Sequence, residues 1–570
     1  MTVNGRGLGF RMILSWTVIL STLYPAYVRG DQKSTPDAPR RLEAILGYIA
    51  SSWATLTRAT NTCEGTADSK LVEASVMYFP ADIKAPTDTD RPAQDCSAKV
   101  EHLPFAIHGP GEVAQHQIQP PGLLFLPHPY VVPGGRFNEM YGWDSYFIIR
   151  GLLRSGKTEL ARGMVDNLFY EIEHYGAVLN ANRTYYLTRS QPPFLSSMIM
   201  AVYESDKAAG KDDRDWLKRA YRYAKTDYEM WTREPHLAGN TGLSRYYDFG
   251  DGPVPEGLHD EEGYYRDVLT YFLRQGKTTP YVVKADSPKS LRHPEYRLEL
   301  CPGTGGPATD PKCSLLQHVA LSSEYYKGDR SMRESGFDIS FRFGPYGAET
   351  DHYAPVCLNS LLYKTETDLE KITTVLGDKK AASRWHDRAK KRRKAIRSLM
   401  WDGKHGMFFD YDFHSSAIST YNYATTFYPL WAGIATEPQA RAVEANLHLF
   451  EHEGGIAMST QDTGVQWDLP YGWAPIQLLA VEGLRRYGYS EDANRISAKF
   501  LGMVLANFER DGTIREKYNV VTDSSNIAVA EGYRDNVIGF GWTNGVFLEL
   551  LHQLPSQWVS KIGSHPQSNH

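Results

Sequence analysis

The sequence predicts an all-α protein in which helical hairpins form a toroid or barrel, with long loops between the helices. Apolar residues recur at spacings of three and four through much of the chain, as in amphipathic helices. Stretches that alternate apolar and polar residues, as strands do, are scarce. Helix pairs of about 30 to 50 residues are joined by loops rich in glycine, proline and aromatic residues. Because long loops in compact domains commonly carry function, we expect the chemistry there.

The first thirty residues have the pattern of an export signal. Arg6 and Arg11 precede the apolar run MILSWTVILSTLYPAYV, and Gly30 is a small residue at which cleavage can occur. We therefore predict a signal peptide over 1–30, a periplasmic or secreted protein, and no membrane span once the signal is removed. The alternative is an uncleaved anchor, although the run is shorter than the ~20 residues of a spanning helix.

Residues 31–115 are predicted to form an N-terminal extension that packs on the main body. One helical pattern covers residues 40–59, and a segment rich in proline and aspartate follows it at 80–96. Residues 116–553 are predicted to form the helical barrel, and the polar stretch 554–570 a flexible tail.

Several stretches of the barrel region place their apolar residues on one helical face, and a basic cluster at 390–394 is predicted to be the solvated face of one of them. These stretches are 146–176, 212–231, 368–401, 439–450 and 474–509.

Five cysteines without a C-x-x-C pair favour disulfides over a metal site. Cys301 and Cys313 bracket a turn-rich loop that a disulfide could close, and Cys63 and Cys96 could form a second bridge. Cys357 is then left over and is predicted to be a buried, unreactive thiol.

The overall composition excludes some classes of partner. The chain has 42% hydrophobic and 23% charged residues and a formal net charge of -5, which is a globular composition without the basic field that a nucleic-acid binder needs. No histidines stand at ligand spacing, so no metal site is predicted.

The stretch PGGRFNEMYGWDSY has the side chains that a sugar site needs. Phe137, Tyr141 and Trp143 can cover the apolar C–H face of a pyranose. Arg136 and Asp144 can make charge-assisted hydrogen bonds to its hydroxyls. A buried aromatic cluster with a structural Arg–Asp ion pair is the alternative interpretation of these residues.

Further polar and aromatic residues occur together in NANRTYYLTRSQPP, RESGFD, QWDLPYGWAP and REKYN. With PGGRFNEMYGWDSY near the start and QWDLPYGWAP near the end, the chain resembles the trehalase family of glycoside hydrolases over about residues 115–550. The resemblance implies an (α/α)6 barrel that splits α,α-trehalose into two glucose molecules with inversion, without metal or cofactor.

The resemblance also implies roles for individual residues. Asp338 in ESGFD corresponds to the general acid, and Glu516 in EKY to the general base. The family's sugar-binding positions fall on Arg136, Trp143, Asp144, Asn180, Arg189, Ser190, Gln191, Gly336 and Trp467.

The chemistry of trehalose fits these two roles. Its anomeric carbons share one oxygen, so cleavage is helped by a proton from a neutral carboxyl group. Asp338 lies among Phe337, Phe341 and Phe343, an apolar setting that favours the neutral form. An Asp in such a loop commonly caps a helix N-terminus, and this is the alternative.

Glu516 stands between Arg515 and Lys517, whose charges favour a carboxylate if either side chain points toward it. The alternative is a surface charge. Inversion also requires the two carboxyl groups to lie ~6.5 to 9.5 Å apart, so that a water molecule fits between them.

The chain departs from the family pattern in two substrate-binding segments. The family's R-P-E segment appears as RHPEY: either Arg292 is displaced by an inserted His293 or the cation has become a histidine, while Glu295 remains. In the last loop the acidic position falls on Tyr533, and the nearest glutamate is Glu531. Both departures bear on which α-glucoside is preferred.

We therefore predict an exported, monomeric, inverting trehalase. One alternative is a hydrolase of another α-glucoside on the same barrel. The other is a non-hydrolytic trehalose-binding protein, which the presence of both carboxylates disfavours.

Overall fold

Helices dominate the computed structural model, which describes residues 38–67, 75–83, 98–114, 117–256, 263–275, 279–285, 287, 298–300, 317–529 and 535–562. Within these ranges, helices contact one another in cyclic order to form a closed inner ring. Its members are α3 (Asp144–Arg154), α5 (Leu195–Ala208), α10 (Val356–Val375), α12 (Tyr428–Ala432), α14 (Ala474–Arg486) and α16 (Gly541–Gln553), and α16 closes the ring against α3. The ring confirms the predicted all-α class and (α/α)6 barrel.

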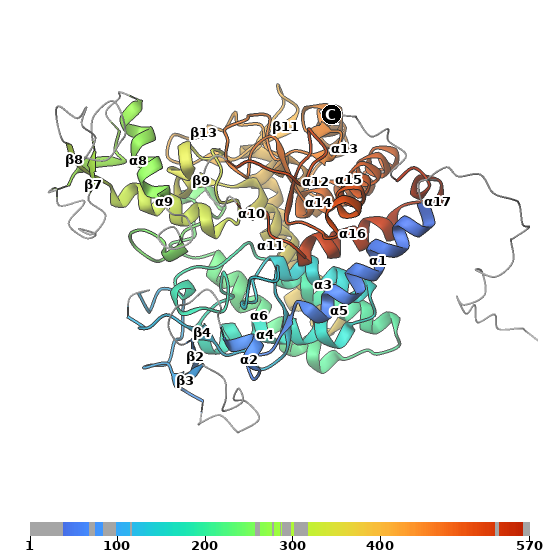
Figure 1. The fold of residues 1–570 in the computed structure, drawn as a ribbon, viewed down its shortest axis with the longest axis horizontal. Coiled ribbons are helices and arrows are strands. Elements are labelled where there is room, and N and C mark those ends of the chain that lie inside the picture. Colours follow the sequence, from blue (N-terminus) through green and yellow to red (C-terminus); the bar gives the residue numbers. More distant parts are fainter. Residues whose placement is uncertain are drawn as a thin grey trace, which may run out of the picture.

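A second layer of helices packs outside this ring. Each outer helix contacts one or two inner ones, so the barrel wall is two helices thick. The outer helices are α4 (Thr158–Tyr175), α6 (Arg214–Trp231), α11 (Lys379–Leu399), α15 (Ser490–Asp511) and α1 (Ala38–Thr55). Although α1 comes from the start of the chain, it lies beside α15 and α16 (Figure 1).

Local sequence explains where many of these helices begin and end. Side chains of Asp213, Ser322, Asp378 and Thr436 each accept a hydrogen bond from the backbone of the first turn that follows. They start α6, α9 (Ser323–Glu334), α11 and α13 (Glu437–Ala445). The helical patterns read from the sequence at 146–176, 212–231, 368–401, 439–450 and 474–509 all coincide with helices.

Short strands form small sheets around the barrel. The strands β2 (Val76–Phe79), β3 (Lys99–His102) and β4 (Leu123–Leu124) pair in parallel. At one side of the molecule, α8 (Tyr264–Arg274) packs on an antiparallel sheet whose strand order is β6-β8-β7 (Figure 1). Its strands are β6 (Val282–Lys284), β7 (Leu298–Leu300) and β8 (Gln317–Leu321).

The remaining strands are hairpins and bridges in loops. They are β1 (Thr57–Arg58) with β5 (Tyr130–Val131), β10 (Trp401–Asp402) with β11 (Met407–Phe408), β9 (Tyr353–Ala354) and β13 (Ala417–Ile418) on either side of β12 (Tyr411–Asp412), β14 (Glu451–His452) with β15 (Gly455–Ile456), and β16 (Tyr471–Trp473) with β17 (Lys517–Asn519).

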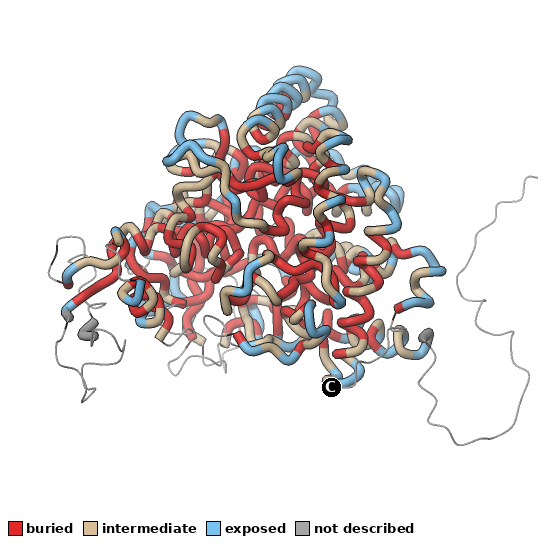
Figure 2. Tube along the Cα trace, turned by 90° about the horizontal axis from the view of Figure 1, so that it is seen from above, coloured by how far each residue is buried: buried red, intermediate tan, exposed pale blue. Residues whose placement is uncertain are grey.

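One large apolar core joins both helix layers, and buried residues fill the centre of the molecule while exposed ones lie at its rim (Figure 2). None of the helices within the described residues is long and apolar enough to cross a membrane. Cys357 is buried and free, as the sequence predicts. Cys63, in the short helix α2 (Cys63–Thr66), is disulfide-bonded, and the candidate partners Cys96, Cys301 and Cys313 lie outside the described residues.

The predicted flexible tail at 554–570 contains a short helix, α17 (Ser556–Val559), which contacts α15. Residues 563–570 lie outside the described residues, as do residues 1–37 with the predicted signal peptide.

Candidate active site

A cavity of about 370 Å³ is lined by residues from several separate stretches of the chain. This volume lies within the ~300–1,000 Å³ of small-molecule sites. Besides Glu256, Tyr264, Asp267 and the segment from Asp535 to Trp542, five stretches contribute, and these centre on Arg136 to Asp144, Asn180 to Gln191, Gly336 to Asp338, Gln466 to Trp473 and Glu516. Each leads to the next helix of the inner ring, namely α3, α5, α10, α14 and α16. Closure of the ring therefore brings residues far apart in sequence to one site.

Indole rings form much of the cavity wall. The rings of Trp467 and Trp473 stack at 3.9 Å, and Trp143 lies 5.9 Å from Trp467 and 5.7 Å from Trp542. Gly336 packs closely against Trp143, since a Cβ at position 336 would lie 3.0 Å from the indole ring. The φ of Gly336 is +73°, a conformation that also favours glycine. Trp143 and Trp467, which the resemblance assigns to sugar binding, both line the cavity.

Asp338 lies in the loop after α9, and its carboxyl group borders the cavity with 21% of the side chain exposed. Nη1 of Arg333 lies 3.9 Å from one carboxyl oxygen. The predicted setting is therefore only half right: Phe337 is buried, but a guanidinium also faces Asp338. Because Asp338 follows a helix end rather than preceding a helix, it is not an N-cap.

Arg333 is held from two sides beneath Asp338. Its Nε lies 3.3 Å from Asp329, and its guanidinium carbon lies 5.1 Å from the centre of the Tyr264 ring. Asp329 also accepts hydrogen bonds from the hydroxyls of Tyr264 and Tyr265, at 3.0 and 2.9 Å. The cation is thus fixed before any ligand binds.

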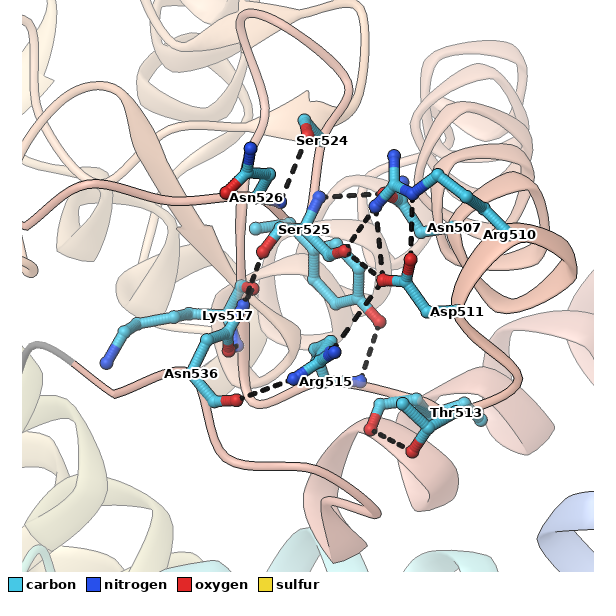
Figure 3. A network of polar contacts seen from close by, with 12 residues as sticks. Asn507, Arg510, Asp511, Thr513, Arg515, Lys517, Ser524, Ser525, Asn526 and Asn536 are labelled. Carbon is cyan, nitrogen blue, oxygen red and sulfur yellow. Dashed lines mark hydrogen bonds and ion pairs between the residues drawn. The ribbon is translucent and has the colours of Figure 1, made fainter.

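Glu516 is 17% exposed and lines the same cavity, so it is not a surface charge. Nζ of Lys517 lies 3.3 Å from its carboxylate. Arg515 turns the other way, donating to the carbonyl of Asn536 at 3.1 Å and facing Asp511 at 3.7 Å (Figure 3). Of the two flanking cations, Lys517 is therefore the one that faces Glu516.

Asp144 is a third carboxyl group in the cavity and is 5% exposed. Burial raises its pKa well above the ordinary value, and the negative charges of Glu516 and, to a lesser degree, Asp338 raise it further. This environment favours the protonated form, which can donate a hydrogen bond.

Arg189 forms a buried ion pair with Glu256, and both line the cavity. Burial acts to raise the pKa of Glu256, but the charges of Arg189 and Arg333 outweigh burial, so this pKa lies below its usual value. Nearer the surface, Nη1 of Arg136 lies 3.1 Å from Asp535.

The other predicted binding residues divide into two groups. Phe137, Tyr141, Asn180 and Gln191 line the cavity. Ser190 does not, because its hydroxyl donates to the carbonyl of Val178 at 2.6 Å behind the wall.

Asp468, which follows Trp467, is also kept away from the cavity. It is fully buried and accepts hydrogen bonds from Thr463, Tyr421 and the backbone of Phe341. Arg292, Glu295 and Glu531 lie outside the described residues.

Sequence reasoning missed several residues of the cavity wall. Arg333, Gln466 and Trp473 stand inside stretches already singled out, namely RESGFD and QWDLPYGWAP, but were not assigned a role. Glu256 follows Pro255 in a P-E pair that was not singled out, and Asp267 had no signal beyond its charge. Among the described residues, no group of three or more His, Cys, Asp or Glu side chains is placed to hold a metal ion.

A closed ring of six inner helices with an outer helical layer, whose loops bring carboxylates and indoles to one cavity, defines the class of (α/α)6 barrel proteins. The family model described as Trehalase matches residues 63–280 and 309–555. The cytosolic neutral trehalase of Saccharomyces cerevisiae is 37% identical over 515 residues, which cover 82% of this chain. The chain therefore belongs to the trehalase family.

Other relatives agree with this assignment. A probable trehalase of Eremothecium gossypii is 37% identical over 74% of this chain, and the cytosolic neutral trehalase of Beauveria bassiana is 36% identical over 76%. The solved structure of neutral trehalase Nth1 from Saccharomyces cerevisiae is 33% identical, has a TM-score of 0.73, and matches 92% of this chain and 96% of its own. The chain spans 64%, 57% and 60% of the lengths of these three curated relatives, in the order named.

The comparisons overturn one sequence prediction. The relatives from Saccharomyces cerevisiae and Beauveria bassiana are named cytosolic, so the prediction of an exported, periplasmic or secreted protein with a signal peptide is wrong. An apolar run after two arginines is a compositional pattern, and composition alone does not fix a compartment.

The assignment of Arg292 and Glu295 from the R-P-E segment stays a prediction. Arg292 and Glu295 fall between the two matched parts of the family model, which leaves residues 281–308 unmatched. Pro255 and Glu256 lie in the matched part, keep the P-E pair, and Glu256 lines the cavity.

Proposed function

We propose that this protein hydrolyses α,α-trehalose to two glucose molecules with inversion, with Asp338 as general acid and Glu516 as general base. The observation that carries the proposal is that both carboxyl groups border one indole-lined cavity in a chain of the trehalase family. Two carboxyl groups at one site are what glycoside hydrolysis requires.

The reaction follows from the roles of these two groups. Asp338 donates its proton to the oxygen that links the two glucoses, and the bond from that oxygen to one anomeric carbon breaks. Glu516 removes a proton from a water molecule, whose oxygen attacks the same carbon from the opposite face. One product is released as α-glucose and the other as β-glucose. Asp338 ends as a carboxylate and Glu516 as an acid, and exchange with solvent restores both.

Two buried cations support this charge movement. Arg333, 3.9 Å from Asp338, stabilises the carboxylate that forms when Asp338 gives up its proton. Lys517, 3.3 Å from Glu516, holds the carboxylate that activates the water in place. Asp144, with its raised pKa, can donate to an acceptor on the sugar.

Glucose release from a set of disaccharides tests this function. We expect the purified full chain to release glucose from trehalose, and from maltose or kojibiose far more slowly. Asp338→Asn and Glu516→Gln should each lower turnover by several orders of magnitude while still binding trehalose in calorimetry. The matched control is Asp387→Asn, on the exposed face of α11, which should behave as wild type.

Each other outcome has a definite meaning. Faster release from maltose or kojibiose would show a different α-glucoside specificity, and binding of trehalose without release would show a non-hydrolytic binding protein. Near-normal turnover in either carboxyl variant would remove that residue from its role.

A further inference from the structure

We infer that Lys517 and Gln466 are positioning residues that join the general base to the general acid through one buried chain of hydrogen bonds. This inference rests on the proposed function, because it assigns the roles of Glu516 and Asp338. It adds that these hydrogen bonds set the distance and orientation between the two carboxyl groups.

The chain begins at the base. Lys517 is fully buried, and its Nζ lies 3.3 Å from Oε2 of Glu516. The same Nζ donates to Oε1 of Gln466 at 2.7 Å and to the main-chain carbonyl of Asp535 at 3.0 Å. Burying an ammonium group costs about several kcal/mol of hydration free energy. Polar partners on several sides are therefore required to stabilise it in the interior.

The chain ends at the acid. Gln466 is 3% exposed, and its Nε2 donates to the main-chain carbonyl of Asp338 at 2.5 Å. The chemistry of the partners fixes the orientation of this amide. A lysine ammonium can only donate, so it must face the amide oxygen, and a carbonyl can only accept, so it must face the amide nitrogen. The amide cannot be reversed without losing both hydrogen bonds.

The tryptophan wall holds both members of the chain. Nε1 of Trp473 donates to the main-chain carbonyl of Gln466 at 2.9 Å, and Nζ of Lys517 lies 5.3 Å from the centre of a Trp473 ring. In addition, Trp473 pairs with Lys517 in the β16–β17 ladder. The two side chains therefore have little freedom to move apart.

The backbone on either side of Glu516 is fixed as well. The side-chain amide of Asn536 accepts from the N–H of Lys517 at 3.2 Å and donates to its C=O at 3.0 Å. Figure 3 shows this amide against the strand, while the Lys517 side chain points away from the rest of the labelled network. Trp542 donates to the carbonyl of Glu516 at 3.2 Å. Because these hydrogen bonds hold the strand in place, the position of Glu516 depends on the hydrogen bond between Lys517 and Gln466.

The physical reason for such a link is the geometry of inversion. The acid and base must lie ~6.5 to 9.5 Å apart with room for one water molecule, and a displacement of about 1 Å can cost roughly 10²-fold in rate. Asp338 and Glu516 come from loops 178 positions apart in the chain (516 minus 338). The Lys517–Gln466 chain joins these loops directly.

Gln466→Glu separates positioning from simple packing. The new carboxylate keeps the acceptor for Lys517 but cannot donate to Asp338. We expect kcat on trehalose to fall roughly 10²-fold while the trehalose dissociation constant changes less than about threefold. The matched control is Gln477→Glu, because Gln477 is also fully buried and bridges the N–H and C=O of Ile456, at 2.8 and 2.7 Å, away from the cavity. It should lower thermal stability yet keep most of kcat.

Lys517→Met and Lys517→Arg test the other link. Methionine removes the charge and every donor, so kcat should fall at least roughly 10²-fold, and arginine should restore part of it. The control is Lys327→Met, since Lys327 is a largely buried lysine that donates to the carbonyls of Asp248 and Gly250 at 2.7 Å each and does not line the cavity. Folding of every variant is checked by thermal unfolding.

The inference is overturned if folded Gln466→Glu and Lys517→Met keep kcat within about threefold of wild type, or lose no more kcat than their controls. Failure of the proposed function gives a different result, because wild type would then release no glucose from trehalose. A rise in KM with unchanged kcat would also overturn it, since it would place these residues in substrate binding.

Discussion

The guanidinium of Arg333 lies 3.9 Å from the carboxyl group of Asp338, and both belong to the short stretch RESGFD. Arg333 is the second-last residue of α9, and Asp338 follows the helix end by four residues, so the chain reverses to bring the two side chains together. Asp329, one helical turn before Arg333, holds the cation from behind at 3.3 Å. The end of α9 therefore carries a prebuilt cation for the proposed acid.

Arg333→Met should lower kcat on trehalose roughly 10²-fold, because the carboxylate formed on Asp338 loses the charge that stabilises it. Arg330→Met is the matched control, since Arg330 is an equally buried arginine of α9 that pairs with Asp248 at 2.9 Å and does not line the cavity. It should destabilise the fold but leave kcat per folded molecule near normal. Steady-state kinetics with thermal unfolding would measure both, and equal kcat losses in the two variants would contradict the assignment.

Gly336→Ala should disturb the cavity more than the same change at Gly377. Both glycines have positive φ, +73° and +83°, so alanine costs roughly 1–2 kcal/mol of backbone strain at either site. At 336 the new Cβ would also lie 3.0 Å from Trp143, whereas at 377 it meets nothing within 4 Å. We expect Gly336→Ala alone to weaken trehalose binding, measured by calorimetry. Equal binding in the two variants would show that the Trp143 contact does not matter.

The sequence predicted the outer helices of the barrel better than the inner ones. Stretches such as 212–231, which became α6, have one polar face toward water and therefore show a helical period. The inner helices α5 and α16 are covered on both sides by other helices. Their residues are buried around most of the helix, so no periodic pattern marked them.

In the candidate site, too, some features could be predicted from the sequence and others could not. Trp143 and Trp467 could be placed from their motifs, because aromatic and charged residues in one loop indicate a sugar site. The ion pairs of the site could not be predicted. The pairing of Arg189 with Glu256 and of Glu516 with Lys517 depends on side-chain directions, which sequence spacing does not fix. Ser190 shows the converse error: it stands within a motif, but its side chain points behind the wall.

Asp144→Asn should change how stability depends on pH. The folded protein raises the pKa of Asp144 above its ordinary 3.8, first through burial and then through the charge of Glu516. Between those two pKa values the folded state binds more protons than the unfolded state, so this group lowers stability as pH rises, by up to about 1.4 kcal/mol per pH unit. Urea unfolding from pH 4 upward should show the Asn variant gaining on wild type. A constant difference across that range would contradict the assigned environment.

Glu256→Gln should raise KM for trehalose more than it lowers kcat, because it leaves Arg189 without its counter-ion in the cavity wall. Glu139→Gln is the control, since Glu139 and Arg183 form a similarly buried ion pair that does not line the cavity. Breaking either pair should cost about 3–5 kcal/mol of stability. Only the change at 256 should alter KM, and a normal KM in folded Glu256→Gln would remove this pair from substrate binding.

The stereochemistry of the first turnovers tests the central claim most directly. Proton NMR of fresh reaction mixtures, recorded before glucose mutarotates, resolves the anomeric protons of α- and β-glucose. If Asp338 and Glu516 act across the cavity as acid and base, trehalose yields the two anomers in equal amounts, and Glu516→Gln abolishes the release of both. Release of α-glucose alone would show retention and would contradict the account.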